Sequence, residues 1–232
     1  VVVAGINQYV REWVDYVSLR KVNNQLAEEN ARLENELMSL RDQVEKSNEQ
    51  DSTQYYYAHL QWDFIPAKVV DLQTASKHNY LVLNKGSRDH VKEGQGVLGQ
   101  NGVVGVVSKV NSSFSLVIPL IHPKMNLSCR IQKNGQQGFL HWEGASYRYA
   151  SLDDVGRHVQ VAEGDTIVTS GLTSRFPEDI LVGVIDKVHL GEGDANYQLR
   201  VRLATDYRGL KYVQIINNQN GHLQDVLTQD VP

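Results

Sequence analysis

The hydrophobic pattern divides the chain into two parts with different periods. Between residues 16 and 47 an apolar residue recurs every seventh position, whereas from Trp62 onward apolar and polar residues alternate in short runs. A seven-residue period is typical of helices that supercoil around a partner, and a two-residue period is typical of β-strands. We therefore predict a mainly β protein with a long N-terminal α-helix, in which a parallel coiled coil precedes two small antiparallel β-barrel-like subdomains.

The leucine row defines a predicted dimer interface. Leucines take four successive d positions of the heptad, and the preceding a positions include two asparagines. An amide buried at position a finds a partner only when its own copy lies opposite, so Asn23 and Asn30 favour parallel, in-register pairing of two identical chains. The residues of this predicted homodimer interface are Tyr16, Leu19, Asn23, Leu26, Asn30, Leu33, Leu37, Leu40 and Val44.

A single amphipathic helix lying on its own domain would also explain the leucine row, with the leucines as ordinary core. The opposite face is polar for more than four turns, which suits a projecting rod better; it carries Glu28, Arg32, Asn35, Arg41 and Asp42. With a rise of about 1.5 Å per residue, a rod of about 32 residues would reach almost 50 Å. We expect the rod to act as a spacer as well as a clamp.

The domain organisation follows from where the heptads stop. We predict a coiled-coil helix over residues 1–47, a polar hinge over 48–57, a β-region over 58–217 and a flexible tail over 218–232. The β-region is expected to contain two barrel-like subdomains, about 58–115 and 116–217, with strands able to exchange between them.

Short runs rich in Val and Ile predict the strands of the β-region. They lie at residues 67–72, 80–83, 103–110, 116–121, 166–169, 182–190, 197–203 and 213–216. Asn101-Gly102 and Asn134-Gly135 separate such runs, and both residue types accept the positive φ of a type I′ turn, so two tight hairpins are predicted. The sheet is therefore expected to be largely antiparallel.

A weak internal repeat supports two similar subdomains. The segment 91–94 (Val-Lys-Glu-Gly) aligns with 161–164 (Val-Ala-Glu-Gly), so that Val97 meets Ile167. After a gap of eight residues, 105–110 (Gly-Val-Val-Ser-Lys-Val) aligns with 183–188 (Gly-Val-Ile-Asp-Lys-Val). Glu-Gly turns occur in any small barrel, which is the alternative explanation; in either case the pattern favours barrels or sandwiches.

Composition narrows the classes of function. The chain has 232 residues, 41% of them hydrophobic, and 23 Lys and Arg against 27 Asp and Glu give a formal net charge of −4 without a long basic block. Nucleic-acid binding depends on clustered cations, so no nucleic-acid partner is predicted. The single cysteine, Cys129, lies in an alternating run and is expected to be a small apolar filler. No stretch reaches the ~18 apolar residues of a membrane span.

No pattern in the sequence predicts a catalytic, cofactor or metal site. The eight histidines never take a metal-ligand spacing, and Gly94-Gln95-Gly96 precedes a strand, where it makes a turn and not a phosphate loop. The alternative is a double-β-barrel serine hydrolase of chymotrypsin-like architecture, in which Ser170 beside Gly171 would be the nucleophile. The glycine surround that supplies an oxyanion hole is missing from that segment.

Several motifs, in order, resemble the family of the rod shape-determining protein MreC. They are Asn79-Tyr80-Leu81-Val82-Leu83-Asn84-Lys85-Gly86-Ser87-Arg88-Asp89-His90-Val91-Lys92-Glu93-Gly94, Gly102-Val103-Val104-Gly105-Val106-Val107, Gly164-Asp165-Thr166-Ile167-Val168-Thr169-Ser170-Gly171, Phe176-Pro177 and Val182-Gly183. With the preceding heptads, the resemblance spans residues 16 to about 217. The family usually has glycine where this chain has His90 and Asp179. Both replacements tolerate the left-handed backbone region, so the turns can survive.

The resemblance implies a non-enzymatic scaffold of the bacterial elongation machinery. Its coiled coil and β-domains would lie on the extracytoplasmic, periplasmic side of the cytoplasmic (inner) membrane, anchored by a helix upstream of Val1. The implied partners are the elongation-class penicillin-binding transpeptidase, MreD and the MreB filament system, and homodimers could extend into filaments.

Overall fold

The structure is a computed structural model that describes residues 25–26, 28–37, 39, 62–74, 78–191 and 195–218. The chain divides into two units, residues 1–50 and 51–232. The described residues of the first unit are helical. The rest of the predicted rod, the predicted hinge at 48–57 and the tail from residue 219 onward lie outside the described residues. In the described part of the chain, no helix is long and apolar enough to cross a membrane.

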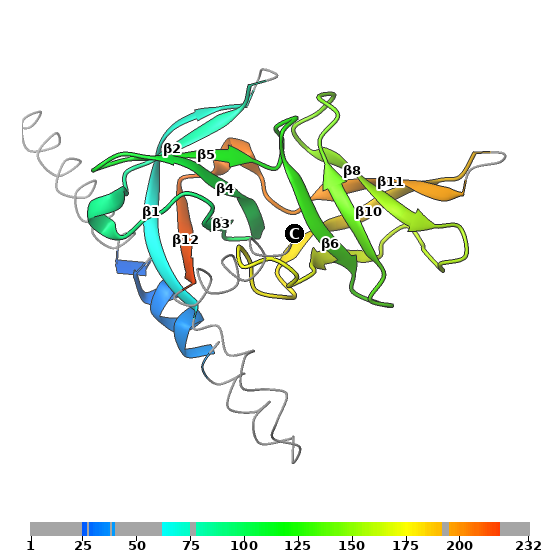
Figure 1. Ribbon diagram of the computed structural model, residues 1–232, viewed down its shortest axis with the longest axis horizontal. Helices are drawn as coiled ribbons and strands as arrows, with labels where there is room; N and C mark the ends of the chain where they lie inside the picture. The colour runs from blue at the N-terminus through cyan, green and yellow to red at the C-terminus, as the bar shows by residue number, and fades with distance from the viewer. Residues whose placement is uncertain are drawn as a thin grey trace, which may run out of the picture. The chain divides into compact units, whose positions relative to one another are not determined.

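The first barrel of the second unit is a closed sheet of six strands in the order β1-β12-β3-β4-β5-β2 (Figure 1). Every neighbouring pair is antiparallel. Its strands are β1 (Trp62–Gln73), β2 (Tyr80–Leu83), β3 (Gly96–Gly99), β4 (Gly102–Val110), β5 (Ser115–Pro119) and β12 (Tyr212–Asn218). The interior is filled by fully buried branched side chains such as Leu81, Val97 and Ile215.

The second barrel is also a closed, antiparallel sheet of six strands, in the order β10-β11-β8-β7-β6-β9. Its strands are β6 (Asn126–Ile131), β7 (Gln137–His141), β8 (Tyr149–Gly156), β9 (Thr166–Thr169), β10 (Leu181–His189) and β11 (Asn196–Leu203). In β11, Leu199, Val201 and Leu203 are buried while the residues between them are exposed. The predicted mainly β fold with two small antiparallel barrels is thus confirmed.

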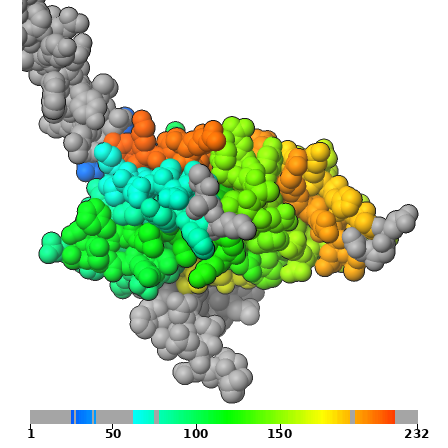
Figure 2. All heavy atoms as spheres, turned by 90° about the horizontal axis from the view of Figure 1, so that it is seen from above, coloured from blue at the N-terminus to red at the C-terminus, as the bar shows by residue number. Residues whose placement is uncertain are grey.

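The chain divides between the barrels differently from the expected boundary near residue 115. Strand β5 lies wholly in the first barrel, and β12 returns from the far end of the chain to pair with β1 and β3. Figure 2 shows the orange C-terminal residues of this strand alongside the cyan residues of β1. The second barrel is therefore one continuous segment, whereas the first is closed only by a strand that follows the second.

The two barrels have the same strand pairing once β12 is placed first in the order. The pairs β12–β3, β12–β1, β1–β2, β2–β5, β5–β4 and β4–β3 correspond to β6–β9, β6–β7, β7–β8, β8–β11, β11–β10 and β10–β9. The first barrel is therefore a circular permutation of the second. The repeat found in the sequence covers β3 and β4 in the first barrel and their counterparts β9 and β10 in the second.

The hydrogen bonds of the two repeats match at the predicted register. The Gly94 amide donates to Val107 O, and the Gly164 amide donates to Ile185 O, both at 2.8 Å. A bulge follows each acceptor at the same place, before Lys109 in β4 and before Lys187 in β10. The strand pairing therefore confirms the alignment of the two repeats, including the gap of eight residues inferred from the sequence.

Both predicted hairpins are present, but neither is a type I′ turn with Asn-Gly at its centre. Between β3 and β4 the turn residues are Gln100 and Asn101, while Gly102 already pairs with Gly99. Between β6 and β7 only Gly135 has positive φ, at 72°, within a longer loop closed by its amide on Ile131 O. The sequence located the turns correctly and assigned them the wrong type.

His90 and Asp179 both adopt the left-handed backbone conformation, each with φ of 66°. These are the two positions where the family usually has glycine, so the expected survival of the turns is confirmed. Asp179 also accepts a hydrogen bond from Arg130 Nη2 at 2.5 Å, and Glu178 Oε1 lies 3.1 Å from the same nitrogen. This ion pair ties the loop before β10 to β6.

A linker of residues 120–125, in which Pro123 and Lys124 are exposed and the other four residues are buried, joins β5 to β6. Leu120 and Ile121 are fully buried, and the Ile121 carbonyl accepts a bond from the buried Asn79 side chain at 2.6 Å. His122 is also buried, and its Nδ1 accepts the Lys124 amide at 3.0 Å. Burial lowers the pKa of His122, and the charges of His78 and Lys124 lower it further.

The segment that returns from β11 to β12 is fixed by Thr205 and Tyr207. Thr205 Oγ1 donates to Val103 O at 2.7 Å. The fully buried Tyr207 hydroxyl donates to Val104 O at 2.6 Å and accepts the Leu120 amide at 3.1 Å. Because burial raises the pKa of Tyr207 far above its ordinary value, this hydroxyl keeps its proton.

The loop before β10 packs closely on the first barrel. A side chain at Gly96 of β3 would lie 2.3 Å from Arg175 O and would overlap the Phe176 ring. The side-chain Nδ2 of Asn218 in β12 donates to Ser174 O at 3.1 Å. Glycine at position 96 is thus required by the neighbouring backbone, since no larger residue fits there.

We predict that Tyr207→Phe lowers the free energy of unfolding by about 1 kcal/mol, the net worth of a buried hydrogen bond. The Val104 carbonyl also accepts a hydrogen bond from the Leu120 amide at 3.0 Å. This bond remains in the variant, so the loss of stability is moderate. Urea unfolding of the full chain measures it. Tyr80→Phe is the matched control, because that hydroxyl bonds an exposed carboxylate, Asp71; an equal loss in both variants would contradict the role of Tyr207.

We also predict that His122 makes stability pH-dependent. Since its folded pKa lies below the unfolded value, the unfolded chain binds the proton more readily, and stability falls as pH drops below about 6.5. His122→Asn offers an acceptor oxygen in place of Nδ1 and cannot titrate, so its stability should fall less between pH 7 and pH 5. Thermal unfolding across this range tests the difference; a wild-type slope in His122→Asn, or the same change in His189→Asn, would refute the assignment.

Candidate functional site

The predicted dimer interface lies partly within the described residues. Leu26, Asn30, Leu33 and Leu37 are described and exposed, the three leucines at 55%, 48% and 44% of their surface. Tyr16, Leu19, Asn23, Leu40 and Val44 lie outside the described residues. Leu26 and Leu33 are two helical turns apart and so share one side of the helix. Pairing through this row stays a prediction.

The charges beside the leucine row pair within one helix. Arg32 donates to both carboxylate oxygens of Glu29, at 3.0 and 2.6 Å, and this bond lowers the pKa of Glu29. In a parallel dimer Glu29 would face Glu34 of the other copy. The intrahelical partner Arg32 offsets that repulsion, so the pair does not oppose dimerisation.

Ser170, the nucleophile of the alternative hydrolase, has a structural role. Its Oγ lies 2.8 Å from Ser128 Oγ and 3.3 Å from Ser128 O, and it accepts the Leu172 amide at 3.4 Å. None of these partners is an imidazole that could take the serine proton. The side chain joins β6 to the end of β9, and the geometry does not favour the hydrolase.

The other reactive side chains considered in the sequence are also accounted for. Cys129 is fully buried in the second barrel, and burial raises the pKa of its thiol, as expected of an apolar filler. Among the described residues, no group of three or more His, Cys, Asp and Glu side chains could hold a metal ion.

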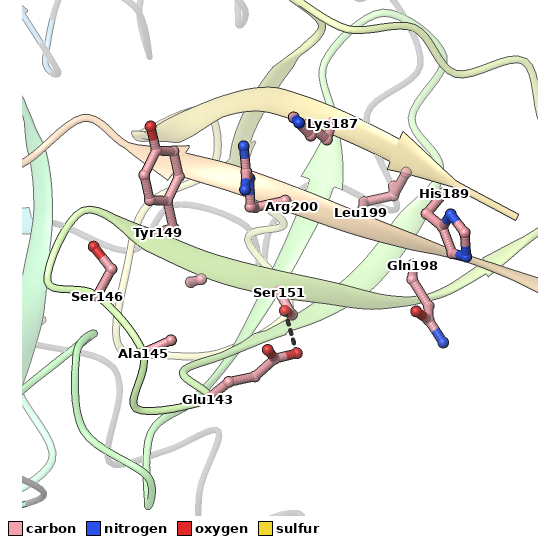
Figure 3. A pocket seen from close by; sticks show the side chains of 11 residues that line it. Glu143, Ala145, Ser146, Tyr149, Ser151, Lys187, His189, Gln198, Leu199 and Arg200 are labelled. Atoms are coloured by element: carbon pink, nitrogen blue, oxygen red, sulfur yellow. Dashed lines mark hydrogen bonds between the residues drawn. The ribbon is translucent and has the colours of Figure 1, made fainter.

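A hollow of about 380 Å³ lies on the outer side of the second barrel (Figure 3). The loop after β7 and strands β8, β10 and β11 form it. Its lining combines small and apolar groups with hydroxyl, amide and charged groups; the residues are Glu143, Ala145, Ser146, Tyr149, Ala150, Ser151, Lys187, His189, Gln198, Leu199 and Arg200.

Charges of both signs face this hollow, and the carboxylates already have partners. Glu143 accepts the Ser151 hydroxyl at 2.5 Å, and its Oε1 also lies 3.9 Å from His141 Nε2. Arg200 donates from Nε and Nη2 to Asp186, and its guanidinium carbon lies 4.7 Å from the centre of the Tyr149 ring. The serine thus meets a carboxylate directly, which differs from the Ser–His–Asp order of a hydrolase.

Further arginines stack on a tyrosine next to the hollow. The Tyr147 ring has the guanidinium carbon of Arg208 at 4.2 Å and that of Arg148 at 5.4 Å from its centre. Arg208 comes from the segment that returns to the first barrel. Such cation–π contacts are each worth about 0.5–1 kcal/mol at exposed sites, which favours this arrangement of the arginines modestly.

Sequence reasoning missed this part of the molecule. Arg200 lies on the outward face of β11, and its partners come from β8 and β10, which are more than ten residues away in the sequence. The sequence carries no signal for these contacts, because they depend on which strands are neighbours in the sheet. The arrangement is suited to binding, since it offers cations, hydroxyls and an aromatic wall without an activated nucleophile.

Comparison with known proteins gives a consistent match. The family model described as "Rod shape-determining protein MreC, barrel core" matches residues 69–217. The cell shape-determining protein MreC of Cereibacter sphaeroides is 31% identical over 138 residues, which are 60% of this chain and 43% of that protein. The chain thus spans less than half the length of this relative.

Solved structures of MreC share the fold. MreC from Listeria monocytogenes superposes with a TM-score of 0.67 at 22% identity, covering 82% of this chain and 91% of that one. A complex between the penicillin-binding protein PBP2 and MreC from Helicobacter pylori matches with a TM-score of 0.55 at 17% identity, covering 68% of this chain and 99% of that one. At these identities the likeness concerns the fold.

Proposed function

The chain belongs to the MreC family of rod shape-determining proteins, since the family model matches residues 69–217, and from this premise we propose that it is a non-enzymatic scaffold of the elongation machinery. It acts on the extracytoplasmic side of the inner membrane, held there by a helix upstream of Val1. The barrels bind the elongation-class penicillin-binding transpeptidase and bias its conformation to maintain rod shape.

The observation that carries the transpeptidase partner is the complex of PBP2 with MreC from Helicobacter pylori, whose fold this chain shares. The construction of the barrels supports the same role. Both are closed by their own strands, so a partner meets side chains on fixed strands. Docking surfaces on rigid elements hold their geometry better than surfaces on loops.

The N-terminal helix supplies dimerisation in this proposal. Leu26, Leu33 and Leu37 are exposed in the single chain, and burial of each leucine in a partner contributes about 1.5 to 3 kcal/mol. The asparagines at position a weaken the pairing and select its register. Confinement to a membrane raises the effective concentration of the copies, so a weakened coiled coil still pairs. Dimers extend into filaments of this protein, and MreD and the MreB filament system are further partners.

We predict that Leu26→Ala with Leu33→Ala converts the dimer into a monomer, because two apolar contacts are lost from each helix. Sedimentation velocity of the full chain measures the mass. The matched control is Glu28→Ala with Arg32→Ala on the outer face, which should leave a dimer. A wild-type protein that is monomeric at every concentration, or a leucine variant of unchanged mass, would sink the coiled-coil proposal.

We predict that a fragment of residues 58–218, which retains both barrels, binds the transpeptidase as well as the full chain does. Co-purification with the tagged transpeptidase domain tests this, with residues 1–57 as the complementary fragment. Recovery of the transpeptidase by residues 1–57 alone would move recognition to the helix. Failure of every form to bind would remove the transpeptidase from the proposed function.

A further inference from the structure

The two barrels present opposite chemistry at one equivalent place on their outer surfaces. In the second barrel, Ser151 of β8 lies opposite Arg200 of β11. The corresponding pair in the first barrel is Val82 of β2 opposite Leu116 of β5. The two pairs are equivalent because Leu116 pairs with Lys109 and Arg200 pairs with Lys187, each directly after the bulge of β4 or β10. The position is therefore polar and basic in one barrel and apolar in the other.

The basic version of this position is not needed to build the barrel. The first barrel closes with the same strand pairing around Val82 and Leu116. An exposed ion pair such as Arg200 with Asp186 adds at most a few tenths to about 1 kcal/mol of stability. The charges of the second barrel therefore require an explanation other than folding.

The cations of the second barrel are arranged for a ligand. Asp186 occupies Nε and Nη2 of Arg200 and the Tyr149 ring stacks against its guanidinium, which leaves further N–H groups of a fixed fork available. Lys187 is exposed beside it, and no carboxylate of the described residues lies within ion-pair distance of its ammonium group. Two cations thus flank one hollow, to which the exposed Ala145 adds an apolar contact.

The adjoining stack extends the same chemistry. Arg148 and Arg208 are exposed, and within the described ranges neither forms an ion pair; both lie over the Tyr147 ring. Arginine and tyrosine are the residue types most enriched at the energetic centres of protein interfaces. We define the basic–aromatic face as Tyr147, Arg148, Tyr149, Lys187, Arg200 and Arg208.

We propose that the basic–aromatic face of the second barrel binds an acidic peptide segment of a partner protein. The guanidinium fork matches carboxylates in a bidentate geometry, and the tyrosine rings and Ala145 accept the aliphatic parts of Asp and Glu side chains. The inference rests on the proposed function only in taking the protein as a scaffold for other proteins.

Charge favours a peptide over a polyanion. The whole chain has a formal net charge of −4, and Glu143 stands in the hollow itself. Long anionic ligands such as nucleic acids gain affinity from many phosphate contacts, which the surrounding acidic chain opposes. A short acidic segment can engage the four cations of this face and avoid the rest of the surface.

The test is fluorescence anisotropy of a fluorescein-labelled hexaglutamate peptide titrated with the full chain at low salt. The wild type should bind. Arg148→Gln with Lys187→Gln should weaken the Kd roughly tenfold, because two contacts of the strength of exposed ion pairs are lost. Neither residue belongs to an ion pair of the described structure, so the fold should survive, which equal melting temperatures check.

The matched control is Lys92→Gln with Lys109→Gln, which removes the same amount of charge. Lys109 is the residue of the first barrel that corresponds to Lys187. The Kd of this control should stay at the wild-type value. Absence of binding by the wild type, or equal weakening in both variants, would overturn the proposal. Binding of anionic phospholipid vesicles but not of hexaglutamate would overturn it too and assign the face to a lipid surface. The transpeptidase co-purification is a separate measurement, so either result can fail without the other.

Discussion

Closure of the first barrel depends on one return of the chain, and a buried hydroxyl fixes where that return lies. Tyr207 bonds to Val104 O of β4 and to the Leu120 amide at the exit of β5. It therefore joins the segment leading into β12 to the linker leading out of the first barrel. Because the hydroxyl is buried and remains protonated, it acts as donor and acceptor at once, which is what two facing backbone groups require.

The hydrophobic pattern of the sequence predicted the features of the fold that depend on neighbouring residues in the chain. Alternation located the strands, residues 25–26, 28–37 and 39 of the heptad region are helical, and the tolerance of His90 and Asp179 for positive φ was correctly expected. Pairing partners far apart in sequence left no such trace. The short run at residues 213–216 looks like any edge strand, and nothing in it reveals that β12 lies between β1 and β3.

The candidate surface was hidden for the same reason. Arg200 and Tyr149 are separated by fifty residues and meet only because β8 and β11 are neighbours in the sheet. Turn types were wrong because strand pairing decides which residues form the turn: the two-residue turn between β3 and β4 contains Gln100 and Asn101, and a longer loop contains Asn134 and Gly135. The composition gave the net charge of the chain but could not show that cations gather on one face of the second barrel.

The barrels also constrain how this protein can meet others. A closed sheet offers no free strand edge, so partners cannot bind by adding a strand, and recognition must use side chains on the outer faces. The two barrels differ at those faces while sharing their interior plan. One fold used twice can thus present two unlike surfaces, one apolar around Leu116 and one basic around Arg200.

The permuted order of strands has a consequence for folding during synthesis, which proceeds from the N-terminus. All the strands of the second barrel are complete at residue 203, while the first barrel still lacks residues 212–218. The barrel that begins first must therefore be finished last. Until then, the position between β1 and β3 has no strand. The second barrel directly precedes β12 in the chain, and all of its own strands are already present.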